Sequence, residues 1–191
     1  MQQLKSYEVE SVLTRYILKN GGFERRKYLG MSQIHRAEDE LIREMLEGTP
    51  VPKPENGLVF ALGYDFEKIM LAKLEASGVL MAMSSKSLVA SFDARFKGHT
   101  DGELIDGSLC EIKSTIDEKL QKIESNKHVP NAHYVQAQMY MHHGGYERDM
   151  IVYVARDTGR VVVRQVRYDK RTAESYNEKA KRILFKIDQM K

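Results

Sequence analysis

The chain contains a single cysteine, Cys110, among its 191 residues. One thiol excludes an intrachain disulfide, a four-cysteine zinc site and a four-cysteine iron–sulfur cluster. Any metal bound by this chain must therefore use oxygen or imidazole ligands. A lone thiol suits a reducing compartment, and the first residues lack the basic-then-apolar order of a secretory leader, so we expect a cytoplasmic protein.

Long apolar runs and a strong excess of one charge are also missing. No window approaches the roughly 18 apolar residues of a membrane-spanning helix, so we expect no membrane partner. The chain has 30 Lys and Arg against 27 Asp and Glu, a formal net charge of +3. This balance permits a nucleic-acid partner without indicating one, because a strongly basic domain is the usual sign of such binding. Hydrophobic residues at 42% and charged residues at 30% predict a folded chain rather than a disordered one.

Proline is scarce, and three of the four prolines fall within residues 49–57. Proline blocks both helix interiors and central strands, so this stretch predicts an exposed loop. It divides the sequence into an N-terminal helical segment with its loop, residues 1–57, and a core, residues 58–191. We expect the two to form one compact domain.

Hydrophobic periodicity predicts the secondary structure. In the N-terminal segment, one helix ends before Asn20-Gly21-Gly22, and a second begins with Ser32 as its N-cap and ends at Gly48. The core is predicted to contain a helix over about 65–76, two strands within 88–115, a helix over 134–143, strands over 150–155 and 161–167, and a helix over 172–190. Hairpin-linked strands together with strands joined across helices predict an α/β fold with a mixed central β-sheet flanked by helices.

The two strands within 88–115 carry the most informative pattern. In the first strand, charged side chains up to Asp101 alternate with apolar or small ones, and in the second, Glu111 and Lys113 alternate with apolar residues. If these strands pair as a hairpin, Asp101, Glu111 and Lys113 converge on one face. Two adjacent carboxylates repel unless a cation lies between them, and such oxygen ligands suit Mg²⁺ or Mn²⁺. A neighbouring lysine that orients and helps deprotonate a water then indicates phosphodiester hydrolysis.

Glu67 adds an acidic residue upstream of these strands. It shares the apolar stripe of its predicted helix with Met70, Leu71 and Leu74, which places its carboxylate toward the sheet. A buried carboxylate without a partner is costly, and a metal would serve as that partner. The alternative is an ordinary helix residue that forms a salt bridge.

Three motifs follow one another along the chain: Gly98-His99-Thr100-Asp101, Glu111-Ile112-Lys113 and Gln136-Ala137-Gln138-Met139-Tyr140. In order and spacing they resemble the GxxD strand end, (D/E)xK strand and QxxxY helix of the PD-(D/E)XK nuclease superfamily, in its RecB-like and phage-exonuclease branch. The resemblance covers about residues 60–170. It implies a restriction-endonuclease-like core, and the missing cysteines imply a member without an iron–sulfur cluster.

The resemblance also implies roles for the motif residues. It assigns Asp101, Glu111 and the backbone carbonyl of Ile112 as ligands of Mg²⁺, for which Mn²⁺ can substitute, and Lys113 as the catalytic lysine.

Two further elements of the site follow from the same resemblance. Gln136 and Tyr140 would line the site, and their spacing of four places them on one helix face. An acid or histidine four residues after a glycine completes many such sites. Gly63 and Glu67 fit this spacing, although histidine is frequent at that position in the family.

Candidate nucleic-acid contacts lie outside the motifs. The N-terminus of the helix predicted after Ser32 would offer free amides to a phosphate, with Arg36 nearby. Arg156, in a strand and turn after the QxxxY helix, is a further candidate. The alternative for each is a solvated surface residue.

We therefore expect a Mg²⁺-dependent DNA nuclease, with an exonuclease in DNA recombination, repair or phage DNA processing favoured. A structure- or sequence-specific endonuclease with the same site is one alternative, and a catalytically silent DNA-binding or regulatory module is another. DNA is the expected partner, and the sequence is compatible with a homo-oligomer or a recombination or replication protein partner.

Overall fold

The computed structural model describes residues 11–12, 16, 26–49, 54–81, 84–126 and 128–190, with only the backbone for 54–58. The elements in chain order are β1 (Leu29–Gly30), η1 (Met31–Gln33), α2 (Glu38–Glu47), α3 (Pro54–Ala76), β2 (Ser87–Ala90), β3 (Asp93–His99), β4 (Gly102–Glu103), β5 (Leu109–Thr115), α4 (Asp117–Asn126), α5 (Asn131–Gly144), β6 (Arg148–Ala155), β7 (Val161–Arg167) and α6 (Lys170–Gln189). The first predicted helix lies outside the described residues, apart from 11–12 and 16, which are helical.

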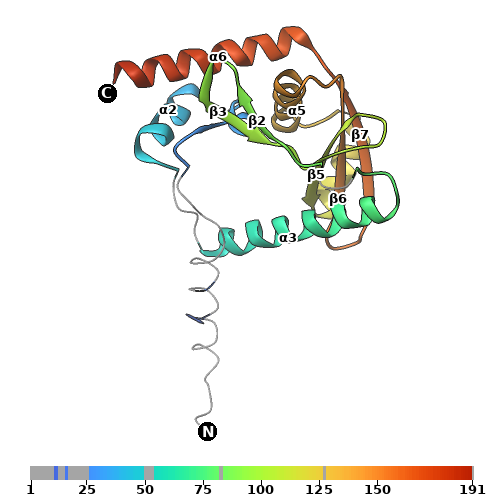
Figure 1. The fold of residues 1–191 in the computed structure, drawn as a ribbon. Helices are drawn as coiled ribbons and strands as arrows, with labels where there is room; N and C mark the ends of the chain where they lie inside the picture. Colours follow the sequence, from blue (N-terminus) through green and yellow to red (C-terminus); the bar gives the residue numbers. More distant parts are fainter. Residues whose placement is uncertain are drawn as a thin grey trace.

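Four strands form the main sheet, in the order β4-β5-β6-β7 (Figure 1). β5 and β6 run parallel, whereas β4 with β5 and β6 with β7 are antiparallel. A parallel pair requires a long crossover, which α4 and α5 provide between β5 and β6. This mixed sheet flanked by helices confirms the predicted α/β class.

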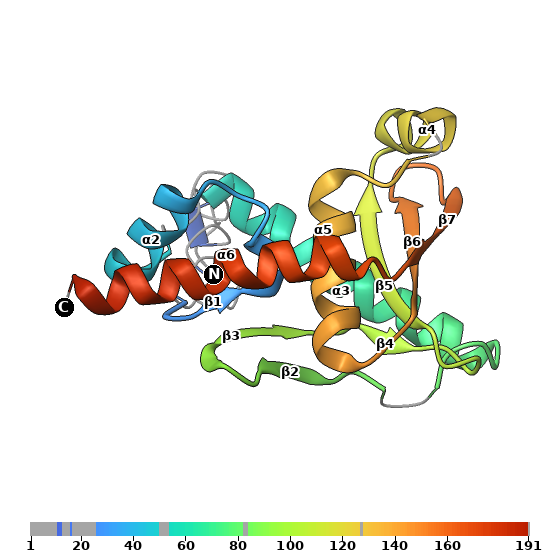
Figure 2. The same ribbon diagram turned by 90° about the horizontal axis from the view of Figure 1, so that it is seen from above.

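The two faces of the main sheet pack against different helices. Cys110 and Ile112 of β5, with Val152 of β6, are buried against apolar side chains of α3. Ile151 and Tyr153 point the other way, into the larger core that includes α5 and α6 (Figure 2). Because side chains alternate along a strand, Glu111 and Lys113 lie on the α5 side. Cys110 packs inward with the α3 side of the sheet, and its burial raises the pKa of the thiol to about 12.

A smaller sheet, in the order β1-β3-β2, lies beside the main one. β1 is parallel to β3, and β2 is antiparallel to it. Leu29, Met31 and Phe96 are fully buried in the same core as residues of α5 and α6. The smaller sheet therefore joins the larger core, and α6 runs along α5 toward α2 (Figure 2).

The predicted hairpin between the first strand and β5 is wrong. That strand ends at His99 and pairs with β2, and only the two residues of β4 pair with β5. The Thr100 N–H donates to the Lys86 carbonyl at 2.9 Å, and the Lys86 N–H donates to Thr100 Oγ1 at 2.9 Å. These bonds hold the chain in the smaller sheet up to residue 100, so it changes sheets at Asp101.

The helix predicted from Ser32 to Gly48 is present and ends at Gly48, but its predicted start and Ser32 as its N-cap are wrong. Ser32 lies in the 3₁₀ turn η1, where its carbonyl contacts His35 Nδ1 at 3.1 Å, and α2 begins only at Glu38, after Ala37. An α-helix, α4, was not predicted, because only one of its side chains, Leu120, is buried and the apolar periodicity is weak.

Helix α3 begins at Pro54, inside the segment predicted as a loop. Proline is tolerated in the first turn of a helix, where its missing N–H leaves no bond unmade. Residue 57 thus falls within α3, and β1 from the N-terminal segment pairs with β3. The division of the chain at that residue stays a prediction.

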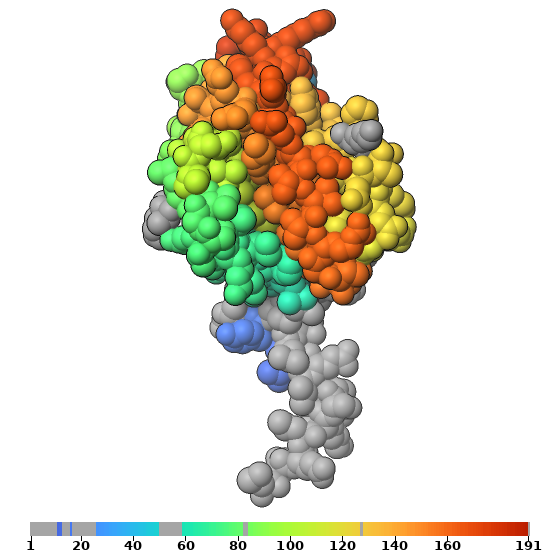
Figure 3. All heavy atoms as spheres, turned by 90° about the vertical axis from the view of Figure 1, so that its right-hand side faces the viewer, coloured from blue at the N-terminus to red at the C-terminus, as the bar shows by residue number. Residues whose placement is uncertain are grey.

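Strand β7 is the edge strand of the main sheet. Figure 3 views the molecule from this side, where β7 and α4 form the surface and α3 lies below them in the view. Val161 and Val163 of β7 are exposed there. Among the helices that the structure describes, none is both long and apolar enough to span a membrane.

Candidate active site

Glu111 lies at the centre of the site. Its strand is flanked by β4 and β6, and its side chain is 6% exposed. Lys113 Nζ donates to Glu111 Oε1 at 2.5 Å, and Gln136 Nε2 of α5 donates to the same oxygen. One carboxylate oxygen therefore receives an ammonium and an amide, which lock its position.

Asp101 reaches this carboxylate from the connection between β3 and β4. Its Oδ2 accepts a hydrogen bond from the Ile112 N–H at 2.7 Å. Ile112 stands between Glu111 and Lys113 in the sequence, so this bond anchors Asp101 beside both. The structure brings the three residues together although only the two residues of β4, and not the strand that precedes Asp101, pair with β5.

Glu67 approaches from α3 on the other side of β5. Gly63, one turn earlier, lies against Ser114 of β5, where an added Cβ would be 3.7 Å from Ser114 Oγ. Phe66, Met70 and other apolar neighbours pack against the sheet, as the predicted stripe requires, and Glu67 is half-buried. Burial and the nearby Glu111 raise the pKa of the Glu67 carboxyl.

The electrostatics of the cluster reflect an excess of carboxylates. Burial, followed by Glu111 and Glu67, raises the pKa of Asp101 well above its ordinary value. Burial alone would lower the pKa of Lys113, but the neighbouring Glu111, Asp101 and Glu67 outweigh it and raise that pKa. Lys113 is therefore an ammonium ion that partly neutralises three acidic groups.

The chemistry of this donor set fits a hard divalent cation. Carboxylates that raise one another's pKa gain from a shared cation, and Mg²⁺ keeps most of its waters, so one or two carboxylates suffice. Among the described residues, no three acidic, imidazole or thiol side chains are already grouped as a metal cage. Glu111 Oε1 accepts hydrogen bonds from Lys113 and Gln136.

The glycine of the first motif and the tyrosine of the third are in contact. A Cβ added at Gly98 would lie 2.6 Å from Tyr140 Cε1 and 3.2 Å from Met31 Cβ. Tyr140 is buried, and burial followed by Glu111 and Asp101 raises the pKa of its hydroxyl. Tyr140 thus packs against the end of β3 beside the acidic cluster.

Two site residues were missed from the sequence. His133 lies one helical turn before Gln136, and its Nδ1 is 2.9 Å from the hydroxyl of Tyr153. Tyr153 of β6 is the register partner of Lys113. The spacing of three between His133 and Gln136 was a usable signal, whereas Tyr153 reads in the sequence as an ordinary core residue.

The predicted nucleic-acid contacts have different surroundings. Arg36 binds Glu40 and Glu44, with its Nη2 2.6 Å from Glu44 Oε1, so its guanidinium is already paired. Ser32 is half-buried in η1. Arg156 is exposed, and its Nη1 is 3.4 Å from Ser114 Oγ, next to Lys113 in the sequence. Of the three, only Arg156 is exposed.

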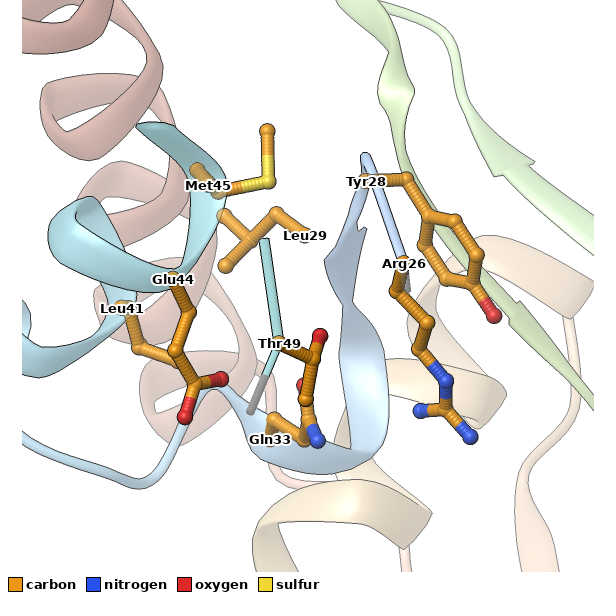
Figure 4. A pocket seen from close by; sticks show the side chains of 8 residues that line it. All are labelled: Arg26, Tyr28, Leu29, Gln33, Leu41, Glu44, Met45 and Thr49. Atoms are coloured by element: carbon orange, nitrogen blue, oxygen red, sulfur yellow. The ribbon is translucent and has the colours of Figure 1, made fainter. Parts of the chain in front are cut away.

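A second group of cations surrounds Tyr28. Lys97 Nζ lies 4.4 Å and the Arg26 guanidinium carbon 5.8 Å from the centre of the Tyr28 ring. Alternation along β3 places Lys97 on the face opposite to the buried Phe96 and Gly98. Figure 4 shows Arg26 and Tyr28 side by side at a shallow hollow between β1 and α2, which none of the acidic-cluster residues lines.

The fold has clear counterparts among solved structures. LHK-Exo, an alkaline exonuclease from Laribacter hongkongensis, superimposes with a TM-score of 0.69 at 15% identity, over 87% of this chain and 90% of that chain. The same enzyme in complex with dAMP gives equal values. The chain has a nuclease-like fold. SSO0001 also matches, with a TM-score of 0.57 at 15% identity over 94% of this chain and 87% of that one. No family model and no curated protein matches the sequence.

Proposed function

We propose that this chain is a metal-dependent deoxyribonuclease of the PD-(D/E)XK type, without an iron–sulfur cluster, and an exonuclease rather than an endonuclease. The observation that carries the proposal is the junction of Asp101, Glu111 and Lys113, fixed by the Ile112 N–H and by Gln136. The likeness in fold to LHK-Exo, an alkaline exonuclease, favours the exonuclease. We place it in the cytoplasm, in recombination, repair or phage DNA processing of the RecB-like and phage-exonuclease kind.

Asp101, Glu111, the Ile112 carbonyl and Glu67 would hold Mg²⁺ or Mn²⁺. When bound, this cation supplies a Lewis acid that stabilises negative charge building on the phosphoryl oxygens. Lys113 orients the attacking water by donating a hydrogen bond from its ammonium.

The remaining residues of the site prepare this geometry. Gln136 keeps the Glu111 carboxylate in place by donating to its inner oxygen. Tyr140 closes the site toward the smaller sheet by packing on Gly98. Because Glu111, Gln136 and Tyr140 are buried, the site excludes bulk water from this side and strengthens each charge interaction within it.

The test is digestion of end-labelled linear and closed circular DNA with Mg²⁺ by the wild type and by Lys113→Met. Lys122→Met is the matched control, since Lys122 pairs with Glu118 on the exposed surface of α4. We expect the wild type and the control to degrade linear DNA only, and Lys113→Met to lose activity.

Each other outcome has a distinct meaning. Cleavage of the closed circular DNA would refute the exonuclease proposal and favour an endonuclease with the same site. No cleavage of either DNA by the wild type, with Mn²⁺ also tried, would refute the nuclease and favour a DNA-binding or regulatory module.

A further inference from the structure

Helix α5 places a second polar side chain over the main sheet, one turn from Gln136. Gln136 lies over Glu111, to which it donates a hydrogen bond. His133 precedes it by three residues and therefore shares its helix face. The ring of His133 lies over the next row of the sheet, formed by the register partners Lys113 and Tyr153, with its centre 5.6 Å from that of Tyr153.

The contact with Tyr153 determines which nitrogen of His133 faces outward. Its Nδ1 is 2.9 Å from the Tyr153 hydroxyl, so Nε2 is on the opposite side of the ring. Nε2 has no hydrogen-bond partner among the described residues, and unlike His143 Nε2 it is not a buried polar atom without one. The outward nitrogen of His133 is therefore open to solvent.

The same contact determines where the proton resides. Burial, with smaller contributions from Lys113 and His35, lowers the pKa of His133 to about 4, so the ring is neutral near pH 7. Tyr153 is 0% exposed, and a buried tyrosine hydroxyl needs an acceptor for its hydrogen. Nδ1 is that acceptor when Nε2 carries the ring hydrogen. The open nitrogen is thus an N–H donor beside the Lys113 ammonium.

We propose that His133 is a substrate contact, which donates from Nε2 to a non-bridging oxygen of the phosphate held next to Lys113, while Tyr153 positions its ring. This inference rests on the proposed nuclease function. A neutral donor suits this place because it binds a phosphate oxygen without adding charge beside Lys113. The competing explanation is that His133 only satisfies the buried hydroxyl of Tyr153.

Two amide substitutions separate these roles. In His133→Asn the short amide occupies the place of Nδ1 and keeps the contact with Tyr153, but nothing replaces Nε2. In His133→Gln the longer amide reaches the place of Nε2. We expect His133→Asn to lower kcat/KM on linear DNA by about 10- to 100-fold, the loss of one hydrogen bond to a charged group, with an unchanged melting temperature. We expect His133→Gln to retain most of the activity. If both variants lose activity only in proportion to stability, or His133→Asn keeps full activity, the contact is structural.

A second measurement does not depend on cleavage. The ¹H–¹⁵N signal of the His133 ring should report an Nε2–H tautomer, and Tyr153→Phe should change it toward a mixture. A short DNA oligonucleotide, added without divalent cation, should shift this signal.

The combined outcomes separate the two proposals. A shift without cleavage by the wild type would retain the His133 contact and refute the nuclease. Cleavage without a shift, with His133→Asn fully active, would retain the nuclease and overturn the contact. Absence of both the signal shift and DNA cleavage would overturn both the His133 contact and the nuclease.

Discussion

Asp149 offers the sharpest quantitative test of the structure. It lies at the start of β6, between β5 and β7, and is 1% exposed. Neither of its carboxylate oxygens has a hydrogen-bond partner among the residues that the structure describes. Burial, followed by repulsion from Glu111, raises its pKa from 3.8 to about 8, and Lys113 only partly opposes this. We therefore expect Asp149 to be a neutral acid in the folded protein at pH 7.

The sign and size of the pH dependence follow. In the unfolded chain Asp149 ionises near pH 4, whereas in the folded protein it keeps its proton up to about pH 8. Between these values the unfolded state binds fewer protons, so the free energy of unfolding falls as pH rises. The slope is about 1.4 kcal/mol per pH unit for one group, and the upper bound over this window is about 6 kcal/mol. Asp149→Asn keeps the size of the side chain and cannot ionise, so it removes this loss.

The assay is urea unfolding from pH 5 to pH 8.5 for the wild type, Asp149→Asn and Ser108→Ala. Ser108 is the control, because it is another buried polar residue next to β5 but does not titrate in this range. We expect the stability gain of Asp149→Asn to grow by about 4 kcal/mol between pH 5 and pH 8, because the slope of about 1.4 kcal/mol per pH unit acts over three units. The free energy of unfolding of Ser108→Ala should change with pH in the same way as that of the wild type. An Asp149→Asn variant that is no more stable at pH 8 would show that the carboxylate is ionised and held by a partner.

Four further substitutions test the site and its surroundings. Gly98→Ala should lower stability by about 1–3 kcal/mol, because its methyl group meets the Tyr140 ring; urea unfolding measures this, and an unchanged midpoint would contradict the close approach. Asp101→Asn keeps an acceptor for the hydrogen bond from the Ile112 N–H but loses the negative charge. It should abolish DNA cleavage, and Mg²⁺ should no longer raise the melting temperature as we expect for the wild type. If Mg²⁺ still raises the melting temperature of the variant, Asp101 is excluded as a metal ligand. Lys97→Ala should weaken DNA binding and reduce its salt slope by about 1, whereas Arg36→Ala, whose guanidinium is paired with carboxylates, should leave fluorescence anisotropy titrations unchanged.

Local patterns were sufficient for much of the site. Period-two alternation placed Glu111 and Lys113 on one face of a strand, and the structure has them on one face of β5. The spacing of four put Gln136 and Tyr140 on one helix face, and in the structure Gln136 on that face donates to Glu111. The apolar stripe of α3 likewise turned Glu67 toward the sheet. Each of these depends only on the period of one element, and a period is readable within about ten residues.

Contacts between distant segments were decided by the tertiary structure. The chain changes sheets at Asp101 because Thr100 bonds to Lys86, a pairing without a signal in either segment alone.

The use of individual polar side chains was decided in the same way. Arg36 reads in the sequence as a free cation, but helix α2 supplies its carboxylate partners. Asp149 only precedes the strand predicted over 150–155, yet it is buried between two strands, and its carboxylate has no hydrogen-bond partner in the described part of the chain. The sequence by itself determined which residue types could form a phosphodiester-cleaving site and on which faces they lie. Only the packing of separate elements decided which charges are paired, buried or open, because desolvation and pairing depend on neighbours far away along the chain.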